Sequence, residues 1–420
     1  MDTLTTRRKF LSHSALAAAG VASTGMSRTD GKTDGDKTKP EELPRYSPPK
    51  KPVIITRETG DETVKEAYAM LLQGTDTLDA ALHVCAGRED DPKDHSVGYG
   101  GLPNEDGVVE LDASVMHGPT RRAGAVGACQ NIRHAGLLAK KVMERSSHVM
   151  MVGAGAEKFA VAEGFQREDL FTDDARKIWL LWKENGRGWW GPGIDSPDWK
   201  PSLDAPKGAI PKAALLPGHP TPEQSAMVLS EMKRLTTLAD RMGIPANLRR
   251  EAVREILWPT TGTIHVSALN TAGEMSGATT TSGLAWKIPG RLGDSSIIGA
   301  GCYTDQDIGS AGATGNGEEN IKVAGAHTII DRMRQGASPK EAGMEALRRI
   351  ARNYNNDMTR LRYLDMIYYI LRRDGAYAGV SLWSTRDIGV QKKFVIHDGT
   401  LRTEPCDYLF EGTTLSIHPF

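Results

Sequence analysis

The folded part of the chain opens with apolar residues whose spacing changes from that of a strand to that of a helix. Residues 53–56 form a short β-branched run, which predicts a buried strand. Over residues 62–73 the apolar positions recur at helical spacing, which predicts a helix that ends before Gly74. A second helix is expected over 78–86. The pattern therefore predicts a mixed α and β fold that begins near Pro52.

The same two spacings recur farther along the chain. Residues 108–116 and 123–129 are predicted to be strands, and residues 135–145 a helix. A further helix is expected over 221–242, because threonine followed by proline is typical of a capped helix start. The last helix of this part is predicted over 247–258.

The N-terminal segment is typical of an export signal. Arg7 and Arg8 precede a weakly apolar, alanine-rich stretch over 15–22, an order that resembles a twin-arginine signal. We therefore expect residues 1–26 to direct export to the periplasm or out of the cell. The apolar stretch is too short to form a stable membrane anchor. Residues 27–51 are almost free of apolar side chains and are predicted to be a disordered spacer.

The composition narrows the choice of partners. Lys and Arg number 52 against 53 Asp and Glu, so the formal net charge of −1 gives no global field for nucleic acid or an anionic membrane. We expect a small-molecule partner. The cysteines are far apart and lack C-x-x-C spacing, so they indicate no zinc site and allow no assignment of disulfides. They are Cys85, Cys129, Cys302 and Cys406.

Candidate chemistry is concentrated after Pro259. Residues 263–269 alternate in polarity as a strand does, and a turn at 272–273 leads to a second strand over 275–280. Short motifs rich in glycine or threonine follow at once, and such motifs are typical of close backbone approaches around a site. They are Thr279-Thr280-Thr281-Ser282-Gly283, Gly290-Arg291-Leu292-Gly293-Asp294-Ser295, Gly299-Ala300-Gly301 and Gly312-Ala313-Thr314-Gly315-Asn316-Gly317-Glu318-Glu319.

With three earlier motifs, these segments resemble the glycosylasparaginase branch of the N-terminal-nucleophile hydrolases, relatives of the plant-type asparaginases and isoaspartyl peptidases. The earlier motifs are Glu89-Asp90-Asp91-Pro92, Ser96-Val97-Gly98-Tyr99-Gly100-Gly101 and Leu111-Asp112-Ala113. The resemblance covers about residues 52–166 and the chain from Thr263 nearly to its C-terminus. It implies an α+β fold in the form of a four-layer αββα sandwich.

The resemblance also implies that the chain cuts itself between Gly262 and Thr263. The cut would separate an α chain over 52–262 from a β chain over 263–420. Within the α chain, residues 186–220 are rich in Gly, Pro and Trp without a lasting period and are predicted to be an irregular linker. Because the family commonly forms dimers of such αβ pairs, we expect a dimer.

An N-terminal threonine has the groups that amide hydrolysis needs. Its hydroxyl is the nucleophile, and its own α-amine, with an ordinary pKa of about 7.7 to 8.0, is the general base. We therefore expect no cofactor and no metal. His265 and His327 are interpreted as core or surface histidines.

The remaining site residues are implied by the resemblance. Thr281 is expected to tune Thr263. Arg291 is expected to bind the substrate's α-carboxylate through two parallel contacts, and Asp294 its α-ammonium. The Thr314 hydroxyl and the Gly315 N–H match the oxyanion hole, where each donor contributes about 3 to 4 kcal/mol.

Two positions depart from the glycosylasparaginase pattern. That branch has His-Asp before the nucleophile, whereas this chain has Thr261-Gly262, and glycine is what plant-type asparaginases show. On the first strand, the Ile55-Thr56-Arg57-Glu58 segment replaces the family's Ser-Thr-Trp. The first change falls at the expected self-cleavage junction, and the second concerns the side of the pocket that accommodates the leaving group.

The expected reaction is hydrolysis of the β-amide of N4-(β-N-acetylglucosaminyl)-L-asparagine to aspartate and the sugar amine. The alternative within the same chemistry is an L-asparaginase or isoaspartyl peptidase that acts on asparagine or a β-aspartyl dipeptide. The alternative of another class is an uncleaved protein that only binds aspartyl-like ligands.

Overall fold

The computed structural model of the protein describes residues 44–185, 196, 222–257, 262–386 and 390–413. Its strands are β1 Val53–Arg57, β2 Leu111–His117, β3 Arg122–Cys129, β4 Met150–Val152, β5 Ile264–Leu269, β6 Met275–Thr281, β7 Cys302–Asp305, β8 Gly309–Gly315, β9 Met366–Arg372, β10 Tyr377–Thr385, β11 Lys393–His397, β12 Leu401–Pro405 and β13 Asp407–Thr413. Its helices are α2 Asp61–Leu72, α3 Thr77–Glu89, α4 Ala135–Arg145, α5 Gly153–Ala162, α6 Asp173–Glu184, α7 Pro222–Arg241, α8 Ala246–Leu257, α9 Gly317–Val323, α10 Gly325–Arg334, α11 Pro339–Asn353, α12 Met358–Leu361 and the 3-10 turn η3 Asp294–Ser296.

The strands form two sheets within the described residues. The larger sheet has eight strands in the order β12-β11-β1-β5-β6-β2-β3-β4, and the smaller has five in the order β13-β10-β9-β8-β7. Pairing is antiparallel except between β3 and β4 and between β10 and β13. The strand β5, which begins directly after Thr263, lies between β1 and β6 in the interior of the larger sheet.

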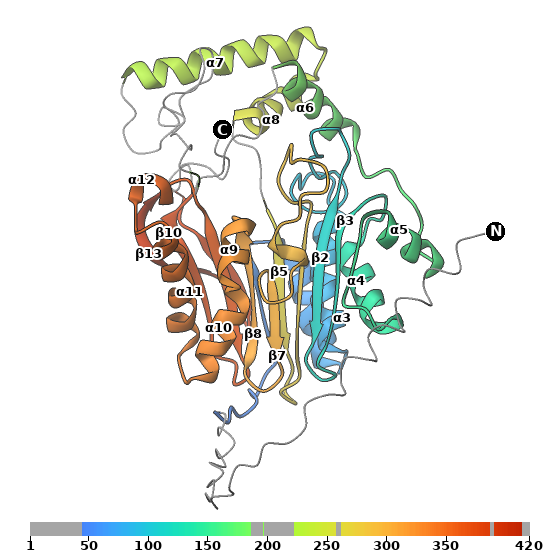
Figure 1. The fold of residues 1–420 in the computed structure, drawn as a ribbon, viewed down its shortest axis with the longest axis vertical. Helices are drawn as coiled ribbons and strands as arrows, with labels where there is room; N and C mark the ends of the chain where they lie inside the picture. Colours follow the sequence, from blue (N-terminus) through green and yellow to red (C-terminus); the bar gives the residue numbers. More distant parts are fainter. Residues whose placement is uncertain (1–43, 186–195, 197–221, 258–261, 387–389, 414–420) are drawn as a thin grey trace, which may run out of the picture. The chain divides into compact units, whose positions relative to one another are not determined.

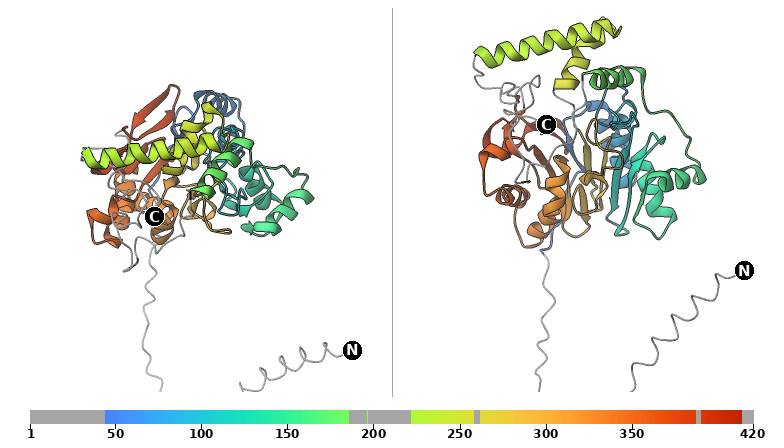
Figure 2. Two further views of the ribbon diagram at one scale, coloured as in Figure 1. Left: turned by 90° about the horizontal axis from the view of Figure 1, so that it is seen from above. Right: turned by 45° about the horizontal axis from the view of Figure 1, so that its top comes forward.

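The helices pack against these sheets in two groups (Figure 1). Helix α3 contacts β5 and β6, and α4 contacts β2 and β3. Helix α10 contacts β8, and α11 contacts β9 and β10 of the smaller sheet. The sheets meet through β5 and β6 on one side and β8 on the other. The two further views in Figure 2 also show α10 and α11 beside the strands of the smaller sheet.

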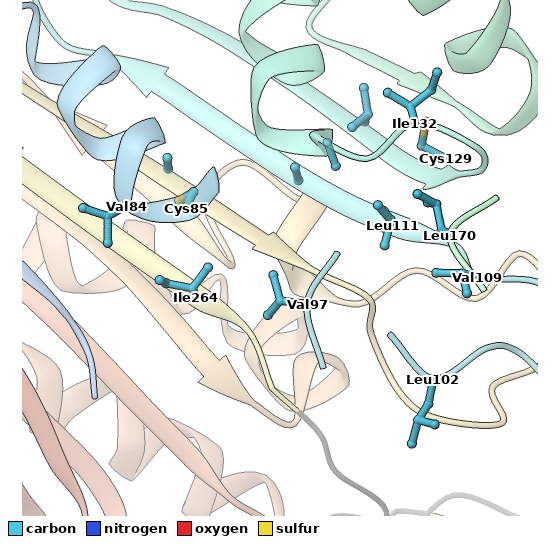
Figure 3. Packing of buried hydrophobic residues seen from close by; sticks show 14 of the residues in the cluster. Val84, Cys85, Val97, Leu102, Val109, Leu111, Cys129, Ile132, Leu170 and Ile264 are labelled. Atoms are coloured by element: carbon cyan, nitrogen blue, oxygen red, sulfur yellow. The ribbon is translucent and has the colours of Figure 1, made fainter. Parts of the chain in front are cut away.

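The hydrophobic core is divided by the sheets. The largest cluster lies between the larger sheet and its helices and includes Val84 of α3, Leu111 of β2 and Ile264 of β5 (Figure 3). A second cluster lies between the smaller sheet and α10 and α11. A third includes Ile55 of the larger sheet and Tyr369 of the smaller one, and this cluster holds the two sheets against each other.

Most predicted elements are confirmed, and one differs in its start. The predicted strand over 108–116 begins only at Leu111. Asn104 causes the difference, because its side chain accepts hydrogen bonds from the backbone N–H groups of Asp106 and Val108 at 3.1 and 3.0 Å. Such a local turn competes with strand pairing, and polarity alone does not reveal it.

The ordered contacts of the chain start before the first strand. Residues 44–51, which fall in the predicted spacer, have no helix or strand. The Tyr46 hydroxyl nevertheless donates a hydrogen bond of 3.0 Å to the Met333 carbonyl. The predicted export signal over 1–26, and the linker over 186–220 apart from Ser196, lie outside the described residues.

The cysteines are buried thiols. All four are free, and burial raises the pKa of Cys129, Cys302 and Cys406 to about 12. In the described ranges, no helix is both long and apolar enough to cross a membrane. The same ranges hold no group of three or more His, Cys, Asp or Glu side chains arranged to bind a metal ion.

Candidate active site

An open pocket of about 270 Å³ gathers most of the predicted site residues. Its walls come from the segment before β5, the end of β6 and its following loop, η3, and the junction of β8 with α9. Of the predicted residues, Thr314 alone does not line it. The lining residues are Gly262, Thr263, Thr281, Gly283, Leu284, Arg291, Gly293, Asp294, Ser295, Gly315 and Gly317.

Thr281 contacts the peptide bond that precedes Thr263. Thr263 is 7% exposed and lies immediately before β5, while Thr281 is the last residue of the neighbouring β6. The Thr281 hydroxyl donates a 2.6 Å hydrogen bond to the Gly262 carbonyl and accepts one of 2.8 Å from the Gly283 N–H. Such a donor draws electron density from the carbonyl carbon, so the Gly262 carbonyl is polarised.

Glycine at position 262 is required by the space around it. A Cβ atom there would collide with the Ser96 hydroxyl and would lie 2.8 Å from the Arg57 guanidinium. Packing therefore explains why position 262 is glycine and not aspartate. The Ser96 and Arg57 side chains fill the volume that a side chain at 262 would need.

Those side chains are held by a buried carboxylate. Arg57 Nη2 pairs with Asp94 Oδ2 at 2.6 Å, and the Ser96 hydroxyl donates to the other oxygen of Asp94. Arg88 contacts the same carboxylate at 2.7 Å. Burial raises the pKa of Asp94, but Arg57, Ser96 and Arg88 outweigh burial and hold the pKa below its ordinary value. Asp94 thus stays ionised and keeps Arg57 beside Gly262.

The loop after β6 is anchored from behind. Trp286 stacks on Trp182 of α6 with ring centroids 5.0 Å apart. Lys287, only 1% exposed, donates to the carbonyls of Glu110 and Ser282 at 3.0 and 3.2 Å. These contacts fix the chain that carries Gly283 and Leu284 into the pocket wall.

Arg291 already binds a carboxylate. Its Nε and Nη2 donate to the two oxygens of Glu318 at 2.8 and 2.7 Å. The Arg291 side chain is 17% exposed and that of Glu318 48% exposed. The geometry shows that Arg291 can hold a carboxylate through two parallel contacts, and an exposed partner such as Glu318 is easily exchanged.

Asp294 is a buried carboxylate with a neutral partner. It is 4% exposed, and Asn320 Nδ2 donates to it at 2.6 Å. Asn320 is itself held by the Tyr368 hydroxyl, which donates to its Oδ1 at 2.7 Å. Burial raises the pKa of Asp294 to about 6, although Asn320 and Arg291 oppose the shift. An added cation would lower the energy of this carboxylate.

The end of β8 carries the predicted oxyanion donors in a constrained backbone. Gly315 has φ of +124°, and a Cβ there would collide with the Asp365 carbonyl. Asn316 N–H donates to the same carbonyl at 2.8 Å, and Asp365 N–H donates to the Asn316 side chain at 2.6 Å. The fully buried Lys392 pairs with the Asp365 carboxylate. Thr314, 9% exposed, has its hydroxyl 3.1 Å from that of Tyr369.

Comparison with known proteins identifies the family. A family model described as Asparaginase matches residues 44–190 and 224–360. This chain belongs to the asparaginase family. An N(4)-(Beta-N-acetylglucosaminyl)-L-asparaginase of Elizabethkingia miricola is 31% identical over 88% of this chain and 88% of the relative. The mouse N(4)-(beta-N-acetylglucosaminyl)-L-asparaginase is 30% identical over 73% of this chain and 79% of the relative.

A plant relative is similar to about the same degree. The probable isoaspartyl peptidase/L-asparaginase 3 of Arabidopsis thaliana is 30% identical over 81% of this chain and 87% of the relative. The resemblance to glycosylasparaginases that the motifs indicated is confirmed, and the chain is an asparaginase-family hydrolase.

Several residues of this asparaginase-family site could not be found from spacing. Asp94 pairs with Arg57, Asn320 donates to Asp294, and Tyr369 contacts Thr314, each from another segment of the chain. No motif joins Tyr369 to Thr314, because the two meet only through the pairing of β8 and β9. Glu318 belongs to the glycine-rich motif over residues 312–319, but only the structure shows that it binds Arg291.

The histidines agree with their interpretation as core and surface residues. His265 is fully buried, with its ring nitrogens 2.8 Å from the hydroxyls of Thr279 and Ser267. Burial lowers its pKa to about 3. His327 is exposed on α10 and contacts the ring of Tyr303 edge-on.

Binding of an α-ammonium beside Asp294 should depend on pH in a defined direction. Asp294 is ionised above a pH of about 6 and protonated below it, and only the carboxylate attracts a cation. We expect the Kd for L-aspartate to rise as pH falls below about 6, approaching tenfold per pH unit. Isothermal titration calorimetry from pH 4.5 to about 8 measures this rise.

The control is Asp294→Asn, which should bind weakly at every pH and show no such step. A wild-type Kd that stays constant between about pH 4.5 and 6 would show that Asp294 does not hold the ammonium.

Proposed function

We propose that this chain is a self-cleaving amidohydrolase that removes the sugar amine from N4-(β-N-acetylglucosaminyl)-L-asparagine. The observation that carries the proposal is the hydrogen bond from the Thr281 hydroxyl to the Gly262 carbonyl, with Thr263 next to it in the pocket. The names of the bacterial and mouse relatives support the substrate.

Self-cleavage uses groups that are already in place. The Thr263 hydroxyl attacks the Gly262 carbonyl carbon while Thr281 stabilises the charge that develops on its oxygen. The C–N bond breaks as its nitrogen takes up the hydroxyl proton, which frees the amine of Thr263 and leaves Gly262 as an ester on the Thr263 oxygen. Water hydrolyses the ester, which releases the Gly262 carboxylate and restores the Thr263 hydroxyl.

Substrate hydrolysis then follows the same logic. The free amine accepts the Thr263 hydroxyl proton as the hydroxyl attacks the β-carbonyl carbon of the substrate. Arg291 binds the α-carboxylate and Asp294 the α-ammonium, while Thr314 and Gly315 stabilise the oxyanion. The proton passes to the leaving amine, and water cleaves the acyl-enzyme to aspartate.

A second candidate has a specific observation in its favour. Arg57 stands against Gly262, which lines the pocket, and the first strand lacks the tryptophan of glycosylasparaginases. A cation there suits a leaving group that bears a carboxylate, such as that of a β-aspartyl dipeptide. The name of the plant relative is consistent with this isoaspartyl peptidase or L-asparaginase activity.

The wider proposals concern the architecture and the location of the enzyme. We propose a four-layer αββα sandwich of the N-terminal-nucleophile type, and the packing of helices on the outer faces of two facing sheets supports it. The active form is proposed to be a dimer of cleaved αβ pairs. The protein is proposed to be exported through the twin-arginine route under the direction of Arg7 and Arg8.

The purified protein should consist of two fragments. We expect a denaturing gel to show them, and Edman sequencing of the β chain to begin Thr-Ile-His-Val, because the polarised bond lies before Thr263. Thr263→Ala should stay intact because it lacks the nucleophile, whereas the matched Thr263→Ser should still cleave. An intact, natively folded wild type would favour the binding protein instead.

Leaving-group preference should depend on Arg57. We expect Arg57→Met to lower kcat/KM for a β-aspartyl dipeptide about tenfold more than for glycosylasparagine, because only the dipeptide presents a carboxylate to the lost cation. The measurement compares kcat/KM for glycosylasparagine, asparagine and the dipeptide.

The matched control is the neighbouring Glu58→Gln. Glu58 is 46% exposed and contacts Arg386 at 3.6 Å, so its neutralisation should leave the three values in the same ratio. Equal losses for all substrates in Arg57→Met would contradict a role in leaving-group choice.

A further inference from the structure

Tyr369 lies next to Thr314 on the face of the smaller sheet that meets the larger one. In the β8–β9 register, Tyr369 is opposite Gly312 and Ile367 is opposite Thr314. Alternate residues of paired strands share a face, so Thr314 and Tyr369 point the same way. Their hydroxyl oxygens are 3.1 Å apart. Neither Thr314 nor Tyr369 lines the pocket, whereas Gly315, the residue after Thr314, does.

The direction of this hydrogen bond follows from burial. Tyr369 is 2% exposed, and burial raises its pKa above the ordinary value, so the phenol keeps its proton. Among the residues that the structure describes, Thr314 is the one hydrogen-bond partner of that phenol. A buried donor left unpaired is costly, so Tyr369 donates and Thr314 accepts.

The consequence concerns the single proton of the Thr314 hydroxyl. If Thr314 donated to Tyr369, it could not also donate to a substrate oxygen. Because Tyr369 donates, the threonine proton remains available for another acceptor. A hydroxyl that accepts one hydrogen bond also becomes a stronger donor of the next.

We propose that Tyr369 is a positioning residue of the oxyanion hole, which orients the Thr314 hydroxyl so that its proton points to the substrate oxygen. The inference rests on the proposed hydrolase function and adds to it a residue outside the pocket lining. Tyr369 touches no substrate and acts only through Thr314.

The chain offers a matched comparison in the adjacent tyrosine. Tyr368 belongs to the core cluster under α10 and α11, and its hydroxyl donates to Asn320, which in turn donates to Asp294. Neighbouring tyrosines thus support different parts of the site: Tyr369 the oxyanion hole and Tyr368 the predicted ammonium site.

The experiment removes one hydroxyl at a time. We expect Tyr369→Phe to lower kcat about tenfold with KM within about twofold, because the oxyanion forms only during the reaction. Tyr368→Phe should mainly raise KM. Both variants should self-cleave at the wild-type rate, because the Thr281 bond to Gly262 is untouched. Steady-state kinetics of the cleaved proteins and denaturing gels give these readouts.

A double-mutant cycle tests whether Tyr369 acts through Thr314. In a Thr314→Val background, Tyr369→Phe should cost no further kcat. A further loss of about tenfold in that background, or a wild-type kcat in the single variant, overturns the inference while the proposed function stands. If cleaved wild-type protein hydrolyses none of the three substrates, the proposed function fails and the inference fails with it.

Discussion

The hydrogen bond from the Thr281 hydroxyl to the Gly262 carbonyl is the contact on which the rest of the site depends. It exists because β5 and β6 are paired, with Ile264 opposite Thr280, which brings the residues just beyond that pair together. It also needs glycine at 262, since Ser96 and Arg57 leave no room for a side chain. The sheet, the turn before Ser96 and the first strand therefore converge on one peptide bond.

The sheets are held in register near this bond by uncharged polar groups. His265 bonds to Thr279 and Ser267, and the Ser267 hydroxyl donates at 2.8 Å to that of Ser310 on the facing sheet. Burial keeps His265 neutral, with a pKa of about 3. A satisfied neutral network of this kind fixes the relative position of β5 and β8 without the desolvation cost of buried charge. It thereby sets the distance between Thr263 and the end of β8.

Local pattern predicted much of this arrangement. The strands on either side of the turn at 272–273 follow from alternating polarity, and the pocket collects Thr263, Thr281, Arg291 and Asp294 because they stand in motifs close along the chain. Short connections between these motifs bring the four residues to one pocket.

The remaining contacts depend on long-range pairing, which the sequence does not display. Arg57 meets Gly262 only because β1 lies beside β5 and Asp94 holds the guanidinium. The bidentate contact of Glu318 with Arg291 depends on where α9 begins after β8. The late start of β2 has another cause. The Asn104 side chain accepts a hydrogen bond from the backbone N–H of Val108, the first residue of the strand that polarity alone predicts.

The most direct test of the central contact is the rate at which freshly purified precursor cleaves, followed by intact-mass spectrometry. Thr281→Val keeps the shape of the side chain and removes the donor to the Gly262 carbonyl. Cleavage should be first-order and independent of protein concentration, and Thr281→Val should slow it by about 10² to 10³, the loss typical of an oxyanion donor. Cleavage of Thr281→Val at the wild-type rate, or a rate that rises with protein concentration, would contradict the account.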